Sequence, residues 1–231
     1  MAGAWLYTLI PAAAAVAGAA AATWRRPGPA LTSAVQHFAA GVVFAAAASE
    51  ILPDLKHQGS AISVVLGGGL GVAVMLLVRW FGERAKGPVS LVATVAVDVL
   101  IDGLVLGIGF AAGVREGLLL TVALTLEVLF LGLSITTELG EALGNSRAKV
   151  ILAVAGIAAL LPLGAVAGTP VGRLPGPWLA GFFAFGLIAL LYLVTEELLV
   201  EAHEGGTEAP WVAAMFFVGF LLLLLLEEAT G

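Results

Sequence analysis

Apolar stretches of about 20 residues recur along the whole chain, separated by short polar segments. Eight of these stretches are long enough for an α-helix to cross a membrane. They cover residues 5–23, 31–53, 61–81, 88–112, 117–140, 148–168, 177–200 and 211–226. Because every connecting segment is short, we expect one transmembrane domain over residues 1–231 and no separate soluble domain. The predicted fold class is an all-α membrane protein with eight transmembrane helices.

The composition agrees with this pattern. Of the 231 residues, 61% are apolar and 11% are charged, and the mean hydropathy is +1.09. A soluble domain of this length could not bury so much apolar surface in one core. The chain contains no cysteine, which excludes disulfides, thiolate metal sites and thiol nucleophiles. A metal ion bound by this protein would therefore need oxygen or imidazole ligands.

Basic residues are divided unevenly between the two sides of the membrane that eight spans define. Seven fall on one side and three on the other: Arg25, Arg26, Arg79, Arg84, Lys86, Arg147 and Lys149 against Lys56, Arg115 and Arg173. Cytoplasmic loops are enriched in Lys and Arg, so the larger set is predicted to be cytoplasmic and both termini extracytoplasmic. We expect a multi-pass protein of the cytoplasmic (inner) membrane.

Carboxylates interrupt two of the apolar stretches near their middle. Asp98 and Asp102 are four residues apart in the fourth stretch, hence on one helix face and near the membrane midplane. Glu127 lies at the same predicted depth in the fifth stretch, and Ser134 and Glu138 continue its face toward the cytoplasm. An ionised carboxylate at this depth costs on the order of 2.5–3.5 kcal/mol, so three of them indicate a function.

These three carboxylates cannot all stay ionised and unpaired, because like charges repel strongly in a medium of low dielectric constant. Protons or a bound cation must compensate them. All ten basic residues fall in or next to predicted loops, so we expect no intramembrane Lys or Arg to do so. A divalent cation on the oxygen atoms of Asp98, Asp102 and Glu127 would resolve the conflict, with protons competing for the same ligands.

Acidic residues also mark the two predicted mouths of the bundle. Glu50 and Asp54 end the second stretch at the outer mouth, and Glu196, Glu197 and His203 end the seventh at the inner mouth. Aligning Glu50 with Glu197 matches Glu-Ile-Leu-Pro-Asp to Glu-Leu-Leu-Val-Glu and maps the first three stretches onto the last three. Those triplets run in opposite directions, so we expect inverted repeats in a 3+2+3 arrangement.

These residues resemble the ZIP (Zrt/Irt-like) family of divalent metal transporters. That family carries His-Asn-x-x-Asp/Glu-Gly in its fourth helix, where residues 98–103 read Asp-Val-Leu-Ile-Asp-Gly, and His-Glu in its fifth, where residues 126–127 read Leu-Glu. Its second helix ends in His-Leu-Leu-Pro-Glu, against residues 50–54 here, and its seventh resembles residues 192–203 in carrying Tyr, a Glu-Glu pair and His. Eight helices with both termini outside also agree with the family.

The resemblance implies one transport site, formed by Asp98, Asp102 and Glu127. Asp98 and Glu50 stand where the family has histidine. Replacing imidazole by carboxylate shifts preference from zinc, the family default, toward harder ions such as manganese or iron. We expect no enzymatic activity and no cofactor, with the divalent metal ion as the transported substrate.

The expected path follows the acidic residues through the membrane. The ion would enter past Glu50 and Asp54, bind at the midplane, and leave along Glu138, Glu196, Glu197 and His203. The expected partners are the metal ion and membrane lipid, with no nucleic acid; a homodimer is left open.

Three other interpretations stay open. The midplane acids could be protonated packing residues that hydrogen-bond between helices. The protein could be a proton-coupled carrier of a small organic cation. It could also be an intramembrane hydrolase built on Glu196, Glu197 and His203, although no second histidine lies at metal-ligand spacing on a neighbouring face. His37, at the inner end of the second stretch, is expected to be an interfacial or hydrogen-bonded side chain.

Overall fold

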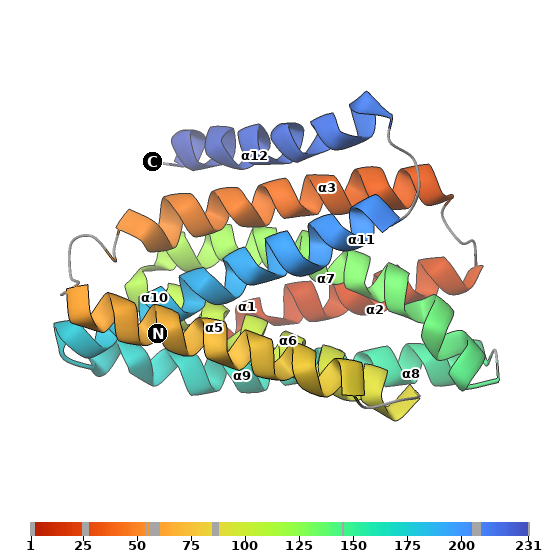
Figure 1. The fold of residues 1–231 in the computed structure, drawn as a ribbon, viewed down its shortest axis with the longest axis horizontal. Coiled ribbons are helices and arrows are strands. Elements are labelled where there is room, and N and C mark those ends of the chain that lie inside the picture. The colour runs from red at the N-terminus through yellow and green to blue at the C-terminus, as the bar shows by residue number, and fades with distance from the viewer. Residues whose placement is uncertain are drawn as a thin grey trace.

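Helices make up the computed structural model of this chain, and most of them run along one direction (Figure 1). The structure describes residues 3–24, 28–53, 55, 61–84, 88–144, 146–204 and 209–230. Within these ranges there is no strand, and eight helical spans are long and apolar enough to cross a membrane. The predicted all-α membrane fold class with eight transmembrane helices is therefore confirmed.

Several spans consist of more than one helical segment. In chain order the spans are α1 (Ala4–Tyr7) with α2 (Leu9–Trp24), α3 (Pro29–Ala46) with η1 (Ala47–Ile51), α5 (Ala61–Arg84), α6 (Pro88–Ala112), α7 (Val114–Ala142), α8 (Arg147–Ala158) with α9 (Leu160–Gly168) and η2 (Thr169–Arg173), α10 (Gly176–Tyr192) with η3 (Leu193–Leu198) and α11 (Leu199–Glu204), and α12 (Pro210–Thr230). The boundaries lie within a few residues of the predicted ones. The largest difference is in the sixth span, which continues past residue 168 as the single 3-10 turn η2.

The fifth span starts earlier than its hydropathy predicts. α7 begins at Val114, directly after the extended backbone of Gly113, and its first turn contains Arg115 and Glu116. These two charged residues lower the hydropathy of the segment, whereas the predicted stretch starts at residue 117. Glu116 in a first helical turn is favourable, because a carboxylate there opposes the positive end of the helix dipole.

Four pairs of helices pack closely against each other: α2 with α7, α6 with α9, α3 with α12, and α5 with α10. Glycines make this approach possible, since lipid provides no hydrophobic drive and small residues let backbones come together. A Cβ atom at Gly132, Gly103, Gly41 or Gly67 would overlap a backbone carbonyl of the partner helix in the respective pair. Figure 1 shows the third pair at the top of the view, with α12 lying along α3.

The pairs associate into two groups of four spans. The α6 group comprises α2, α6, α7 and α8–α9, which pack extensively on one another. The α3 group comprises α3, α5, α10–α11 and α12. The two groups meet chiefly where α3 crosses α7 and where α6 contacts α5 and α10. The interior of the bundle between α6, α7, α3 and η3 holds the polar residues described below.

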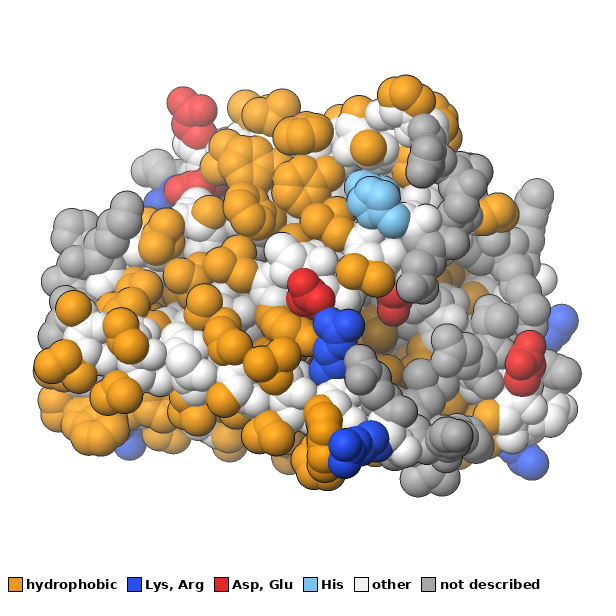
Figure 2. All heavy atoms as spheres, in the orientation of Figure 1, with side chains coloured by type: hydrophobic (Ala, Val, Ile, Leu, Met, Phe, Trp, Pro, Cys, Tyr) orange, Lys and Arg blue, Asp and Glu red, His pale blue; other side chains and the backbone are white. Residues whose placement is uncertain are grey.

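The outer surface of the bundle is apolar. Figure 2 shows a face covered mostly by hydrophobic side chains, with few charged ones. Large apolar residues such as Leu66 and Leu70 of α5 and Leu222 and Leu225 of α12 are exposed. A soluble monomer rarely exposes so continuous an apolar surface, whereas contact with lipid tails requires it.

Candidate functional site

Three carboxyl groups are buried together in the interior of the bundle. Asp98 and Asp102 of α6 are 7% and 3% exposed, and Glu127 of α7 is 3% exposed. The carboxyl groups of Asp102 and Glu127 lie within hydrogen-bonding reach of each other. A carboxylate oxygen can only accept a hydrogen bond, so one of these two groups must carry a proton whenever the bond exists. A cation that displaces this proton would gain two oxygen ligands at once.

All three carboxyl groups line one cavity, which has a volume of about 30 Å³. This volume is close to the share of one water molecule in the liquid. The other polar side chains that line it are Gln36 of α3, Ser134 of α7, Glu197 of η3 and Glu201 of α11. The cavity therefore lies where the two helix groups meet, with carboxyl groups contributed by both.

No known family model and no curated protein sequence matches the chain. What the cavity can bind follows from its own chemistry. Five acidic residues line it, and none of the lining residues is Lys, Arg or His. Such a lining attracts a cation and repels an anion.

The cavity carboxyl groups keep unsatisfied hydrogen-bonding capacity. Asp98 Oδ1, Asp102 Oδ2 and Glu127 Oε2 are buried and have no hydrogen-bond partner among the described residues. Leaving such an atom unpaired costs about 1–3 kcal/mol, and more when it is charged. Within the described ranges no three His, Asp or Glu side chains are already gathered into a cluster of metal ligands. The acids predicted to converge thus face one small space, and their side chains would have to turn toward an ion that enters it.

π-helical turns in the second and seventh spans carry the other predicted acids. η1 contains Glu50, and η3 contains Glu196 and Glu197. In η1 the N–H of Leu52 donates to the carbonyl five residues earlier, and in η3 the N–H of Leu199 does the same. π turns inside α-helices are rare and are frequent at functional sites. The turn in η3 brings Glu197 to the cavity.

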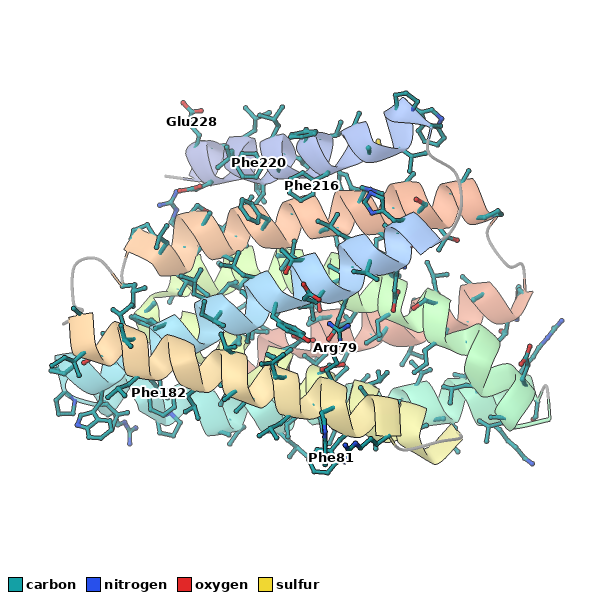
Figure 3. All side chains as sticks on the ribbon, in the orientation of Figure 1. Arg79, Phe81, Phe182, Phe216, Phe220 and Glu228 are labelled. Carbon is teal, nitrogen blue, oxygen red and sulfur yellow. The ribbon has the colours of Figure 1, made fainter. Side chains whose placement is uncertain are left out.

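Glu196 faces a different partner. Its Oε2 accepts a hydrogen bond of 2.7 Å from Arg79 of α5, and both side chains are about half exposed. Figure 3 shows Arg79 near the centre of the view, directed from α5 toward the seventh span. Arg79 lies inside the third span rather than in a loop. Arg79 is close to the end of that span, next to the following loop as the sequence predicts, and it places a positive charge near the cavity-lining Glu197.

The predicted outer mouth is only partly described. Glu50 is 4% exposed and accepts a hydrogen bond of 3.0 Å from Ser49 Oγ, so it is buried and does not line the cavity. Asp54 lies outside the described residues. At the inner side, the side chain of Glu138 also lies outside the described residues, and His203 is exposed and does not line the cavity.

Sequence reasoning missed Gln36 as a cavity residue and predicted Glu201 only as part of the acidic segment that ends the seventh stretch. Gln36 donates a hydrogen bond of 2.8 Å from its Nε2 to Glu201 Oε2, and both residues line the cavity. Glu201 lies four residues after Glu197, so the periodicity of a helix could have placed both on one face. Gln36 follows Ser33 by three residues, and this short polar face in an apolar stretch was a usable signal.

Proposed function

We propose that this protein is a multi-pass membrane transporter of a divalent metal cation, with Asp98, Asp102 and Glu127 binding the ion in transit. The observation that carries the proposal is the small cavity, lined by five acidic residues and no basic one. A bound divalent ion would satisfy the unpaired oxygens and offset the repulsion between the acids. The motifs that resemble the ZIP family support the same function.

The ligand chemistry supports a hard or intermediate ion. The lining offers carboxyl, amide and hydroxyl oxygens, with no nitrogen or sulfur donor that would favour a soft ion. Oxygen ligands suit manganese and ferrous iron better than imidazole does, although carboxylates also bind zinc. Manganese and iron are therefore the favoured substrates, with zinc as the default of the family that the motifs resemble.

The cavity favours transport of a metal ion over the other two candidate functions. Room of about 30 Å³ suits a single ion and is small for an organic cation. A hydrolase built on Glu196, Glu197 and His203 would need these side chains at one site. Glu196 is paired with Arg79, and among these three residues Glu197 alone lines the cavity.

We also propose that the first three and last three spans are inverted repeats, in a 3+2+3 arrangement with both termini extracytoplasmic. Aligning the triplets exchanges α2 with α8–α9, α3 with α10, α5 with α12 and α6 with α7. Under this exchange the α2/α7 pair corresponds to the α9/α6 pair, and the α3/α12 pair corresponds to the α10/α5 pair. All four are pairs of closely packed helices, as inverted repeats require.

The π turns support the same alignment. Glu50 and Glu197 are 147 residues apart, and Leu52 and Leu199, whose N–H groups close the two turns, have the same separation. The excess of basic residues in the predicted cytoplasmic loops supports the orientation in the inner membrane. In this orientation the ion enters past Glu50 and Asp54 and leaves toward Glu138, Glu196, Glu197 and His203.

The packing favours movement of the α6 group against the α3 group over rocking of the two triplets. Within the first triplet, α2 makes no substantial contact with α3, so these spans do not form one body. The cavity lies between the two groups and takes its acids from both, so that relative movement would change access to it. Inverted repeats around a midplane site are a common basis of alternating access.

Uptake into proteoliposomes tests the function. We expect the wild-type protein to transport at least one ion from a panel of Mn²⁺, Fe²⁺, Zn²⁺, Co²⁺ and Mg²⁺, and Asp102→Asn and Glu127→Gln to reduce uptake at least about ten-fold. Glu228→Gln is the matched control, because Glu228 is exposed at the end of α12, pointing away from the bundle (Figure 3), and should transport as wild type does. Uptake of no ion, or variants equal to wild type, would refute the proposal.

A further inference from the structure

Two histidines from different spans lie side by side. His37 belongs to α3 and His203 to α11. The centres of their rings are 5.0 Å apart, and the ring planes are inclined at 59°. The two helices are held together next to this pair, because Ser33 Oγ donates a hydrogen bond of 2.6 Å to the carbonyl of Ala202.

Both rings are oriented through Nδ1. His37 Nδ1 lies 2.9 Å from the carbonyl oxygen of Ser33, and His203 Nδ1 lies 2.6 Å from that of Leu199. A carbonyl oxygen can only accept, so both Nδ1 atoms must carry the hydrogen. In the neutral imidazole Nε2 then has the free lone pair. Metal-binding histidines typically have this arrangement, with the second ring nitrogen donating to a backbone carbonyl.

The environment of His37 adds an independent observation. His37 is 5% exposed, and its Nε2 is buried with no hydrogen-bond partner among the described residues. His203 is exposed, so an ion can approach the pair from outside the bundle. The buried Nε2 of His37 has a free lone pair and lies beside the accessible imidazole of His203. A cation could accept the lone pairs of both rings.

The spacing of the rings suits one shared metal ion. A metal–nitrogen bond of about 2.0–2.1 Å places the ring centre roughly 3 Å from the ion, and a tetrahedral angle then separates two ring centres by about 5 Å. The observed separation is 5.0 Å. Both histidines belong to the α3 group, so the pair stays intact if the two groups move against each other.

We propose that His37 and His203 form a second cation site, which binds a borderline divalent ion such as Zn²⁺, Co²⁺, Ni²⁺ or Cu²⁺ through both Nε2 atoms, with water completing the coordination. Imidazole ligands favour these ions over Mg²⁺, Ca²⁺ and Mn²⁺. The site contains no acid of the carboxyl cavity. It does not rest on the proposed transport function, and it can be tested on protein that transports nothing.

Electron paramagnetic resonance with Cu²⁺ as the probe tests this site on the full-length, tag-free protein in nanodiscs. We expect nitrogen couplings from two imidazoles at one equivalent of Cu²⁺. His37→Asn and His203→Asn should each remove one imidazole and weaken Cu²⁺ binding at least about ten-fold. Excess Zn²⁺ should displace the Cu²⁺, and excess Mg²⁺ should not.

Two control variants locate the signal. The chain has three histidines, so His57→Asn must leave the two-imidazole spectrum unchanged. Asp102→Asn, which should abolish the proposed transport, must also leave it unchanged, and this separates failure of one proposal from failure of the other. His203 is exposed, so its variant should keep the fold even if His37→Asn does not, as circular dichroism can verify. A spectrum without imidazole couplings, or one that depends on His57 or Asp102, would overturn the proposal.

Discussion

A cysteine cross-link between the two helix groups should stop transport. Gly186 of α10 and Val105 of α6 face each other across the group boundary: a Cβ atom at position 186 would lie 3.6 Å from both methyl carbons of Val105. Val105 is fully buried and lies one turn from Asp102, so the contact is near the carboxyl cavity. The chain has no native cysteine, and the double variant Gly186→Cys/Val105→Cys therefore contains a single thiol pair.

The structure sets how far such a cross-link would restrict movement. A disulfide holds its two Cβ atoms about 3.5–4.5 Å apart, which leaves about 1 Å of play between the helices at this point. A slide of one group past the other by one helical turn takes about 5.4 Å, which is well beyond this play. The cross-linked protein should therefore bind its ion and fail to release it on the other side.

The assay compares uptake into proteoliposomes before and after oxidation, and again after reduction. We expect uptake by Gly186→Cys/Val105→Cys to fall at least about ten-fold on oxidation and to return on reduction. The matched control is Gly71→Cys/Ile188→Cys, which joins α5 to α10 inside the α3 group, where a Cβ at position 71 would lie 3.1 Å from the Cβ of Ile188. This cross-link should leave uptake unchanged. Full transport by the first variant, with bond formation verified by mass spectrometry, would refute movement between the groups.

Two further predictions concern packing and charge. Gly103→Ala should lower the melting temperature of the solubilised protein relative to Gly156→Ala. A Cβ at position 103 overlaps the backbone of Leu161, whereas a Cβ at position 156 meets nothing within 4 Å. Overpacking of this kind costs about 1–3 kcal/mol, and equal melting temperatures would contradict the prediction. Arg79→Glu and Glu196→Arg should each destabilise the protein more than their combination does, as a double-mutant cycle in thermal unfolding can measure, with a coupling of about 1 kcal/mol or less for so exposed a pair.

The sequence was sufficient to predict the fold class and the convergence of three acids. Runs of apolar residues gave eight spans, and the rise of a helix put Asp98, Asp102 and Glu127 at one level, where the structure has them lining one cavity. These features depend on residues within a single helix or on a depth that all helices share. Neither requires knowledge of which helices are neighbours.

The sequence does not predict which helices contact each other. With 30 glycines in the chain, many helix faces are small enough for close approach, so the pairing of α3 with α12 or of α5 with α10 could not be singled out. Gln36 reaches the cavity, and His37 reaches His203, because α3 lies against α11, the last segment of the seventh span. Arg79 lies near the end of the third predicted stretch, but its pairing with Glu196 of the seventh span could not be predicted without knowing that these helices are neighbours.

The two proposed sites differ in ligand chemistry, and this difference decides how they are related. The carboxyl cavity favours hard ions, and the imidazole pair favours borderline ions. Fe²⁺ and Zn²⁺ are acceptable to both, so a transporter of either ion could pass it from the cavity, past Glu201, to His203. Mn²⁺ and Mg²⁺ bind imidazole weakly, and for such a substrate the histidine pair would stand apart from the transport path.

Two orders of ions distinguish these arrangements: the order of uptake in the panel, and the order in which the ions displace Cu²⁺ from the protein. Their comparison tells a path with two successive sites from a transport site accompanied by a separate metal site. If the two orders agree and His203→Asn slows uptake, the sites are successive; if the orders are opposite and His203→Asn leaves uptake unchanged, they are separate.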